Sequence, residues 1–474
     1  MSHVITDAST GRDPYGVRWS IAVLVSAAIA ISYLDRQTLP IAIGEIQREF
    51  PISNSVKAFL DSAFLITYGL MYVGGGRLMD SLGTRRGFLI IMAFWSIACA
   101  SHGFANGVMM LGASRLLLGI GEGGGFPAAT RVVAEWFPVK DRATAMGIIN
   151  AGTGIGGVVA PPLIAIIITQ ISWFGLSSWR WVFFITGGLG LLWTLWWARA
   201  YFGPGDFSRD RRAPARLIDT GAELGLGGPG SGFTPNVHHG SANERAQFRP
   251  VMEKTRAPTA SNIPMRELLR FRETWGVIGA KFLSDAAWYF YMFWLPKYLL
   301  DARGFNIKAV GSVAWIPFAA AAIGCLVGGG LSSWLLHQGR SVNAARKVAL
   351  GLSAVLMPCV MLVPHVSVTW VIILFSVAFF GQQSWSTLVM ILPTDLFPKH
   401  AVGTVAGFVG LGGALGGVVM GQLAGYLLDH GFSYTPVLAI AGSLHVAAFL
   451  LILATVRSLQ PLPLKPEFLT TNPR

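Results

Sequence analysis

Residues 112–138 read GASRLLLGIGEGGGFPAATRVVAEWFP and place charged side chains inside a long apolar stretch. Arg115 and Glu122 lie seven positions apart. On a helix they would therefore share nearly one face, about 10 Å apart along the axis. Either group costs at least ~2.5 kcal/mol in hydrocarbon, so such residues normally line a bundle interior or a wet cavity and carry function. The stretch predicts a buried site for an anion and a proton, and a packing ion pair is the alternative.

The composition is that of a membrane protein. The chain has 474 residues, of which 53% are hydrophobic and 12% charged, with a mean hydropathy of +0.55. Soluble chains have about a quarter of their residues charged. The net charge of +13 could indicate nucleic-acid binding. The excess Lys and Arg, however, lie in short connections on one side, as the positive-inside rule requires. We therefore expect no nucleic-acid partner.

The apolar runs predict an all-α fold with twelve spanning helices, because each run is long enough to cross about 30 Å of hydrocarbon. The expected cores are 19–43, 57–78, 87–106, 108–132, 144–169, 180–202, 274–299, 308–336, 346–365, 367–393, 402–428 and 434–457. Cations such as Arg85, Arg86 and Lys399 follow alternate spans, whereas the first connection on the opposite side, Glu45 to Lys57, is mixed in charge. This pattern predicts that both termini are cytoplasmic.

The sequence predicts three parts: a six-helix bundle over 1–202, a cytoplasmic linker over 203–273 and a second six-helix bundle over 274–474. The linker is rich in Gly, Pro and Arg and ends in PMRELLRF at 264–271, a predicted amphipathic helix at the membrane surface. It contains His238-His239, but no Cys or carboxylate stands at ligand spacing, so we expect no metal site.

The two bundles repeat one another. A shift of 260 positions places Gly121 on Gly381, and it also aligns the run Gly156–Val159 with Gly416–Val419. Duplicated halves with a binding site at their interface are the usual plan of secondary carriers. The same shift places Glu122 on Gln382, so only the first half has an ionisable group there.

The glycine pattern Gly119-x-Gly121-x-x-Gly124 matches a dinucleotide-binding fingerprint by letter. No predicted strand precedes it, so we interpret these glycines as helix-packing positions. No Walker loop, nucleophile–base pairing or metal-ligand cluster is evident in the sequence. We therefore expect no cofactor and no enzymatic activity.

One loop carries a family resemblance. The stretch GRLMDSLGTRR at 76–86 stands between two predicted spans and resembles the loop signature of the major facilitator superfamily. The resemblance implies two six-helix bundles around a central cavity that opens alternately to either side. ISYLDR at 31–36, the Arg115 to Pro138 stretch and KFLSDAAWYFYMFWLPKY at 281–298 resemble the anion:cation symporter branch, and its hexuronate transporters most of all.

That resemblance implies proton-coupled import of a hexuronate, such as glucuronate or galacturonate, across the cell inner membrane. It implies that Arg36 binds substrate with Tyr33 and Tyr68, and that Asp35 and Glu122 are the protonating acids. Some carriers of the branch have a Gln in their fifth helix; here the expected neighbours are Asn150 and Thr153.

The residues support a similar site independently of the resemblance. A carboxylate substrate calls for a fixed cation, and guanidinium offers a planar, bidentate fork. A simple charge partner on another helix is the alternative role for Asp35, and a local i, i+4 pair with Asp285 is the alternative for Lys281. Further substrate-binding candidates are Arg115, Lys281, Trp288, Tyr289, Gln382, Gln383, Trp385 and Ser386.

We therefore expect a monomeric carrier that contacts membrane lipid and binds a small anionic substrate and protons. Within transport, the alternatives are galactonate-, tartrate- or phthalate-like anions. From another class, a transporter-like sensor could use the same site without transporting its ligand.

Overall fold

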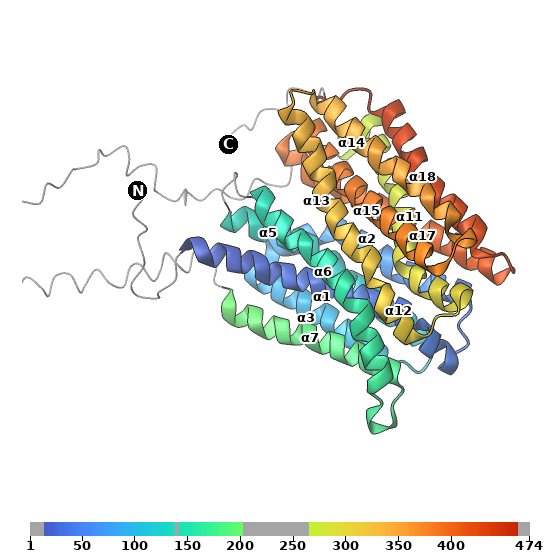
Figure 1. Cartoon of the computed structure of the whole chain (residues 1–474). Coiled ribbons are helices and arrows are strands. Elements are labelled where there is room, and N and C mark those ends of the chain that lie inside the picture. The colour runs from blue at the N-terminus through green and yellow to red at the C-terminus, as the bar shows by residue number, and fades with distance from the viewer. Residues whose placement is uncertain (1–13, 138–141, 202–264, 463–474) are drawn as a thin grey trace, which may run out of the picture.

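The computed structural model describes residues 14–137, 142–201 and 265–462, and its regular elements there are all helices (Figure 1). The predicted linker, with His238-His239, lies outside the described residues except for its last turns. Each of the twelve predicted spans coincides with a helical segment.

The first half contains seven α-helices in its described residues. They are α1 (Pro14–Glu49), α2 (Asn54–Leu82), α3 (Thr84–Ser101), α4 (Val108–Gly123), α5 (Gly125–Trp136), α6 (Arg142–Gln170) and α7 (Ser178–Ala200), with short 3₁₀ turns η1 (His102–Phe104) and η3 (Trp173–Gly175).

The second half follows the same plan with more interruptions. Its elements are α10 (Met265–Leu268), α11 (Arg272–Arg303), α12 (Ile307–Val313), α13 (Trp315–His337), α14 (Val342–Leu356), η6 (Met357–His365), α15 (Val368–Val389), α16 (Leu392–Leu396), α17 (Lys399–Asp429) and α18 (Tyr434–Thr455). The helix predicted over 264–271 is thus only the single turn α10.

Several predicted boundaries differ from the structure. The predicted span 108–132 is divided into α4 and α5 at Gly124, within a run of glycines that stabilises helix poorly. The predicted span 57–78 begins at Lys57, the end of the mixed-charge connection, whereas α2 begins earlier, at Asn54. The charge of Lys57 lowers the local hydropathy, so the apolar pattern begins later than the helix does.

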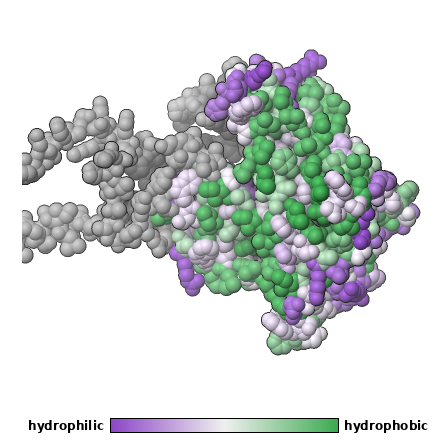
Figure 2. Space-filling view, viewed as in Figure 1, coloured by the Kyte–Doolittle hydropathy of each residue, from purple (hydrophilic) through white to green (hydrophobic). Residues whose placement is uncertain are grey.

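The described helices match the dimensions of a membrane. Ten of the described segments are long and apolar enough to cross one. The two other predicted spans are α4, with 16 residues, and α11, whose charged side chains lower its hydropathy. Figure 2 shows a wide apolar band on the face in view, with hydrophilic residues at its top and lower right margins.

Glycines bring equivalent helices together in the two halves. A Cβ on Gly152 or Gly156 of α6 would clash with backbone carbonyl oxygens of α1. In the second half, a Cβ on Gly416 of α17 would clash with the carbonyl oxygen of Phe282 on α11. Because positions 156 and 416 are related by the same shift of 260, the sequence repeat is also a packing repeat. The glycines interpreted above as helix-packing positions behave in the same way, since a Cβ on Gly119 would clash with α2 and one on Gly121 with α3.

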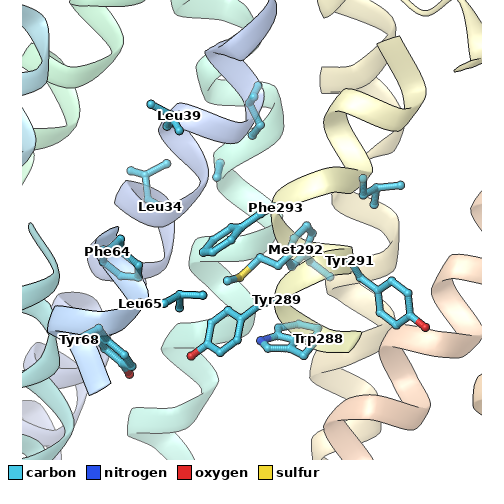
Figure 3. Close-up of a cluster of buried hydrophobic side chains, with 14 of the residues drawn as sticks. Leu34, Leu39, Phe64, Leu65, Tyr68, Trp288, Tyr289, Tyr291, Met292 and Phe293 are labelled. Atoms are coloured by element: carbon cyan, nitrogen blue, oxygen red, sulfur yellow. The ribbon is translucent and has the colours of Figure 1, made fainter. Parts of the chain in front are cut away.

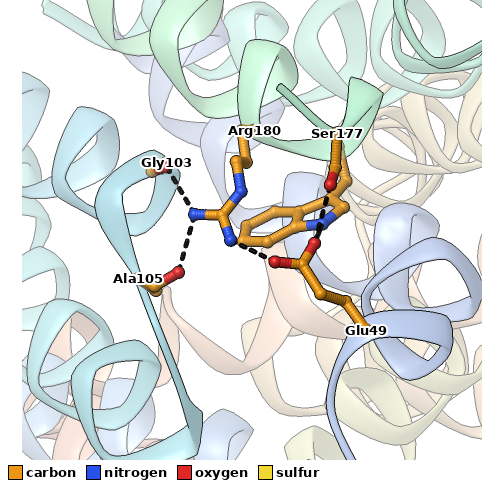
Figure 4. Close-up of polar contacts among 6 residues, drawn as sticks. Glu49, Gly103, Ala105, Ser177 and Arg180 are labelled. Carbon is orange, nitrogen blue, oxygen red and sulfur yellow. Dashed lines mark hydrogen bonds and ion pairs between the residues drawn. The ribbon is translucent and has the colours of Figure 1, made fainter. Parts of the chain in front are cut away.

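The first half is held together at one end by Glu49 (Figure 4). This last residue of α1 accepts hydrogen bonds from Ser177 Oγ and Trp179 Nε1, both at 2.8 Å, and pairs with Arg180 of α7. Arg180 also donates to the carbonyl oxygens of Gly103 at 3.1 Å and Ala105 at 2.7 Å. The network therefore joins α1, α7 and the connection between α3 and α4.

Candidate functional site

A buried ion pair joins α1 to α4. Arg36 Nε lies 2.7 Å from Glu122 Oε2, and both side chains are almost fully enclosed. Ser32, one turn before Arg36, donates its hydroxyl to the same carboxylate oxygen at 2.8 Å. The other oxygen, Oε1, has no hydrogen-bond partner among the described residues. Glu122 therefore retains an unused acceptor beside the Arg36 guanidinium.

Aromatic rings surround the Arg36 guanidinium. Its central carbon lies 4.4 Å from the ring centroid of Tyr68, 4.7 Å from that of Tyr33 and 5.6 Å from that of Phe64. Contacts at these distances are favourable cation–π interactions, and they strengthen away from water. Tyr33 and Tyr68 thus lie against Arg36; their role in binding substrate stays a prediction.

The aromatic rings around Arg36 reach the second half. Phe64 packs edge-on against Phe293 of α11 with ring centroids 6.4 Å apart. Figure 3 shows Phe64, Leu65 and Tyr68 on one side and Tyr289 and Phe293 on the other. Tyr289 lies within electrostatic range of both Arg36 and Asp285. The Arg36–Glu122 pair is therefore next to the interface between the two halves.

Arg115 is fully buried but does not pair with Glu122 in this structure. Its Nε and Nη2 atoms have no hydrogen-bond partner among the described residues. Asp61 of α2 is its foremost electrostatic neighbour, and Asp61 is bound to Lys57 Nζ at 2.6 Å. Lys57 and Asp61 were not among the predicted site residues. Their i, i+4 spacing at the start of an apolar run was the signal that could have found them.

Asp35 faces away from the ion pair. Its side chain is fully buried and lies beside Cys99 of α3 and Thr186 of α7. Neither carboxylate oxygen makes a well-oriented hydrogen bond within the described part of the chain. No described cation lies within ion-pair distance of it either, so the alternative role as a charge partner is not seen in this structure. Glu122 and Arg115 are within its electrostatic range.

A second polar cluster lies in the second half. Lys281 Nζ is 2.9 Å from Asp285 Oδ1, so the pair on α11 does have the local i, i+4 geometry. The same amine donates to Ser386 Oγ of α15 at 2.9 Å, and Gln382 Nε2 lies 3.5 Å from Asp285 Oδ1. The cluster therefore joins two helices rather than one.

His445 of α18 completes this cluster. It is fully buried, and its Nε2 atom is hydrogen-bonded to Gln382 Oε1. His445 was not among the predicted site residues, because no polar residue stands near it in its apolar run at a spacing that would place both on one helix face. Its contact with Gln382 depends on how α15 and α18 pack.

The remaining candidates lie outside these contacts. Trp288 packs edge-on against Phe318 and Phe379, and Trp385 is a core residue against His445 and Phe449. Gln383 is half-buried. Asn150 and Thr153 are half-buried on α6, where the Thr153 hydroxyl donates to the carbonyl oxygen of Asn150 at 2.8 Å.

A family model described as Major Facilitator Superfamily matches residues 25–421. The chain belongs to this superfamily. Its two pseudo-repeated bundles are the superfamily architecture, so the fold predicted from the sequence is confirmed. This member of the superfamily is a multi-pass membrane transporter.

Several of its relatives in sequence are sugar-acid transporters. It is 31% identical to a D-galactonate transporter of Escherichia coli O6:H1 over 425 residues, covering 89% of this chain and 91% of the relative. It is 28% identical to a hexuronate transporter of Escherichia coli K12 over 432 residues, with 90% of each chain covered. A galacturonate transporter of Dickeya chrysanthemi is 30% identical and covers 72% of this chain and 89% of its own length.

The structure also resembles a solved transporter. The match is a bacterial homologue of the human lysosomal transporter Spinster in an inward-facing, occupied conformation, with a TM-score of 0.64 and 18% identity. The alignment covers 94% of this chain and 96% of the other. At that identity the likeness concerns the fold.

Proposed function

We propose that this transporter imports a sugar acid, a hexuronate in particular, by proton symport through alternating access. One observation carries the proposal: the Arg36–Glu122 pair is buried beside the interface between the halves. Relatives that transport galactonate, hexuronate and galacturonate support the choice of substrate class. We also propose that the protein acts as a monomer in the cell inner membrane, with both termini cytoplasmic.

The pair couples substrate to proton by competition for one guanidinium. Arg36 is the cation whose planar fork fits a carboxylate, and Glu122 occupies one of its donors. A hexuronate carboxylate that binds Arg36 displaces Glu122. An uncompensated buried carboxylate costs about 3–5 kcal/mol, so Glu122 takes a proton when it loses Arg36. Substrate and proton therefore bind together. The substrate carboxylate and the Glu122 carboxylate never share the guanidinium.

Asp35 provides the second acid. It is buried without a cation partner among the described residues and lies within electrostatic range of Glu122. Two acids that interact in this way titrate as a coupled set rather than singly. Arg115 lies within electrostatic range of both and attracts the anion toward them.

The second half recognises the sugar hydroxyls. Lys281, Ser386 and Gln382 offer donors from α11 and α15. Tyr289 lies within electrostatic range of both Arg36 and Asp285, which belongs to this cluster. A substrate with a carboxylate at one end and hydroxyls along its length would bridge the two halves. That geometry favours a sugar acid over a purely aromatic acid.

Uptake into proteoliposomes tests the proposal. Purified protein is reconstituted, a pH gradient is imposed, and accumulation of labelled glucuronate is followed with galactonate, tartrate or phthalate as competitors. The proposal expects accumulation above the external concentration that collapses with a protonophore. Binding without accumulation would indicate a sensor. Accumulation that a protonophore does not reduce would overturn proton symport. Stronger competition by galactonate than by unlabelled glucuronate would reassign the substrate.

A further inference from the structure

His445 is a buried group that the proposed mechanism does not use. It lies on α18 with no measurable exposure, and its ring packs edge-on against Trp385 with centroids 5.6 Å apart. Its Nε2 atom is bonded to Gln382 Oε1, whereas its Nδ1 atom has no hydrogen-bond partner among the described residues. One ring nitrogen is therefore engaged and the other is not.

This arrangement determines the tautomer of His445. A carbonyl oxygen only accepts hydrogen bonds, so Nε2 must carry the hydrogen and donate it. Nδ1 is then the bare nitrogen of a neutral imidazole. A proton on Nδ1 would instead create a buried donor with no acceptor. The contacts of the ring therefore match the neutral form with hydrogen on Nε2.

The same bond determines the orientation of the Gln382 amide. With its oxygen held by His445, the amide must direct its NH₂ group toward Asp285 Oδ1, 3.5 Å away. Asp285 Oδ1 also forms an ion pair with Lys281 Nζ, and the same amine donates a hydrogen bond to Ser386 Oγ. In the opposite orientation, the amide oxygen would face the Asp285 carboxylate, which is a repulsive contact. His445 would then have to carry its hydrogen on Nδ1, where it has no acceptor among the described residues.

We propose that His445 is a positioning residue: it fixes the Gln382 amide so that Gln382 is a hydrogen-bond donor toward α11 and toward the oxygens of a sugar acid. This inference rests on the proposed function, because it assumes that Gln382 faces the substrate. His445 itself touches no substrate. It acts through Gln382, since the amide has no internal preference between its two orientations.

The test is a double-mutant cycle between His445 and Gln382. The variants are His445→Leu, Gln382→Leu and the pair, with glucuronate affinity and unfolding temperature measured for each. Loss of the positioning bond should weaken binding about tenfold, or about 1.4 kcal/mol. In the Gln382→Leu background, His445→Leu should cost no further affinity, because no amide remains to be oriented. His445→Gln returns a donor to this position and should recover most of the affinity.

His102 supplies a matched control. It is also fully buried, but it bonds carbonyl oxygens at the end of the preceding helix α3 at 2.9 and 3.0 Å and stacks on Phe183. His102→Leu should lower the unfolding temperature and leave glucuronate affinity within twofold. Equal affinity of His445→Leu and the wild type would overturn the inference, as would additive losses in the double variant. If the wild type binds none of glucuronate, galacturonate and galactonate, the proposed function itself is refuted, independently of the role of His445.

Discussion

Glu122 and Gln382 occupy equivalent positions of the two halves, and each faces the long helix that opens its half. Glu122 on α4 accepts from Arg36 on α1 at 2.7 Å, whereas Gln382 on α15 lies 3.5 Å from Asp285 on α11. In the first half the opposite charges lie on two helices and can be separated. In the second half Lys281 and Asp285 lie on one helix and stay together. In the mechanism that we propose, this asymmetry assigns proton coupling to the first half.

Arg36→Lys should weaken substrate binding by about tenfold or more, although the charge is kept. An ammonium group lacks the planar fork that holds a carboxylate with two hydrogen bonds. Isothermal titration with glucuronate measures the effect, and Arg48→Lys, at an exposed arginine of the same helix, is the control. Unchanged affinity would place the carboxylate elsewhere, and Lys281 would be the next candidate.

Lys57→Met should destabilise the protein by about 3–5 kcal/mol, because it leaves the buried Asp61 carboxylate without its cation. The amine lies 2.6 Å from Asp61 Oδ2 and 4.2 Å from the ring centroid of Trp294. The double variant Lys57→Met with Asp61→Leu should recover part of the loss, since neither member of the pair is left as an unpaired charge, although Arg115 loses its foremost electrostatic neighbour. Thermal unfolding in detergent compares them. Equal destabilisation by the single and double variants would refute the argument.

Gly416→Ala should lower the unfolding temperature, by a free energy of about 1–3 kcal/mol, because its methyl group would clash with the carbonyl oxygen of Phe282. Gly421 lies on the same helix with no atom within 4 Å of an added Cβ. Gly421→Ala should be neutral or stabilising by up to about 1 kcal/mol, through helix propensity alone. Similar shifts in both variants would show that the packing of α17 on α11 tolerates the added methyl.

The sequence allowed some of these contacts to be predicted and others not. Charge in an apolar run predicted that Arg115 and Glu122 are buried, because the cost of a charge in hydrocarbon is the same in any fold. Helical periodicity placed Arg115 and Glu122 on one face. It did not reveal that Glu122 pairs with Arg36, since the choice of partner depends on which helices meet.

The same limit explains the residues that were missed. His445 gains its partner only when α18 packs on α15. Lys57 stood at the edge of the predicted span 57–78, because its charge masks the earlier start of α2. The division of the fourth span at Gly124 was also missed, although the surrounding glycines favour a break. The repeat at a shift of 260 was the reliable long-range signal, because equivalent glycines pack equivalent helices.

Glu122→Gln tests the coupling claim most directly. The amide removes the proton site but keeps the shape, and Gln382 occupies the equivalent position of the second half. The variant is reconstituted beside the wild type, and two quantities are measured in the same liposomes: exchange of labelled for unlabelled glucuronate, and accumulation driven by a pH gradient. The account predicts that exchange persists while gradient-driven accumulation is lost. Accumulation by the variant with the wild-type pH dependence would contradict it and make Asp35 the leading coupling residue.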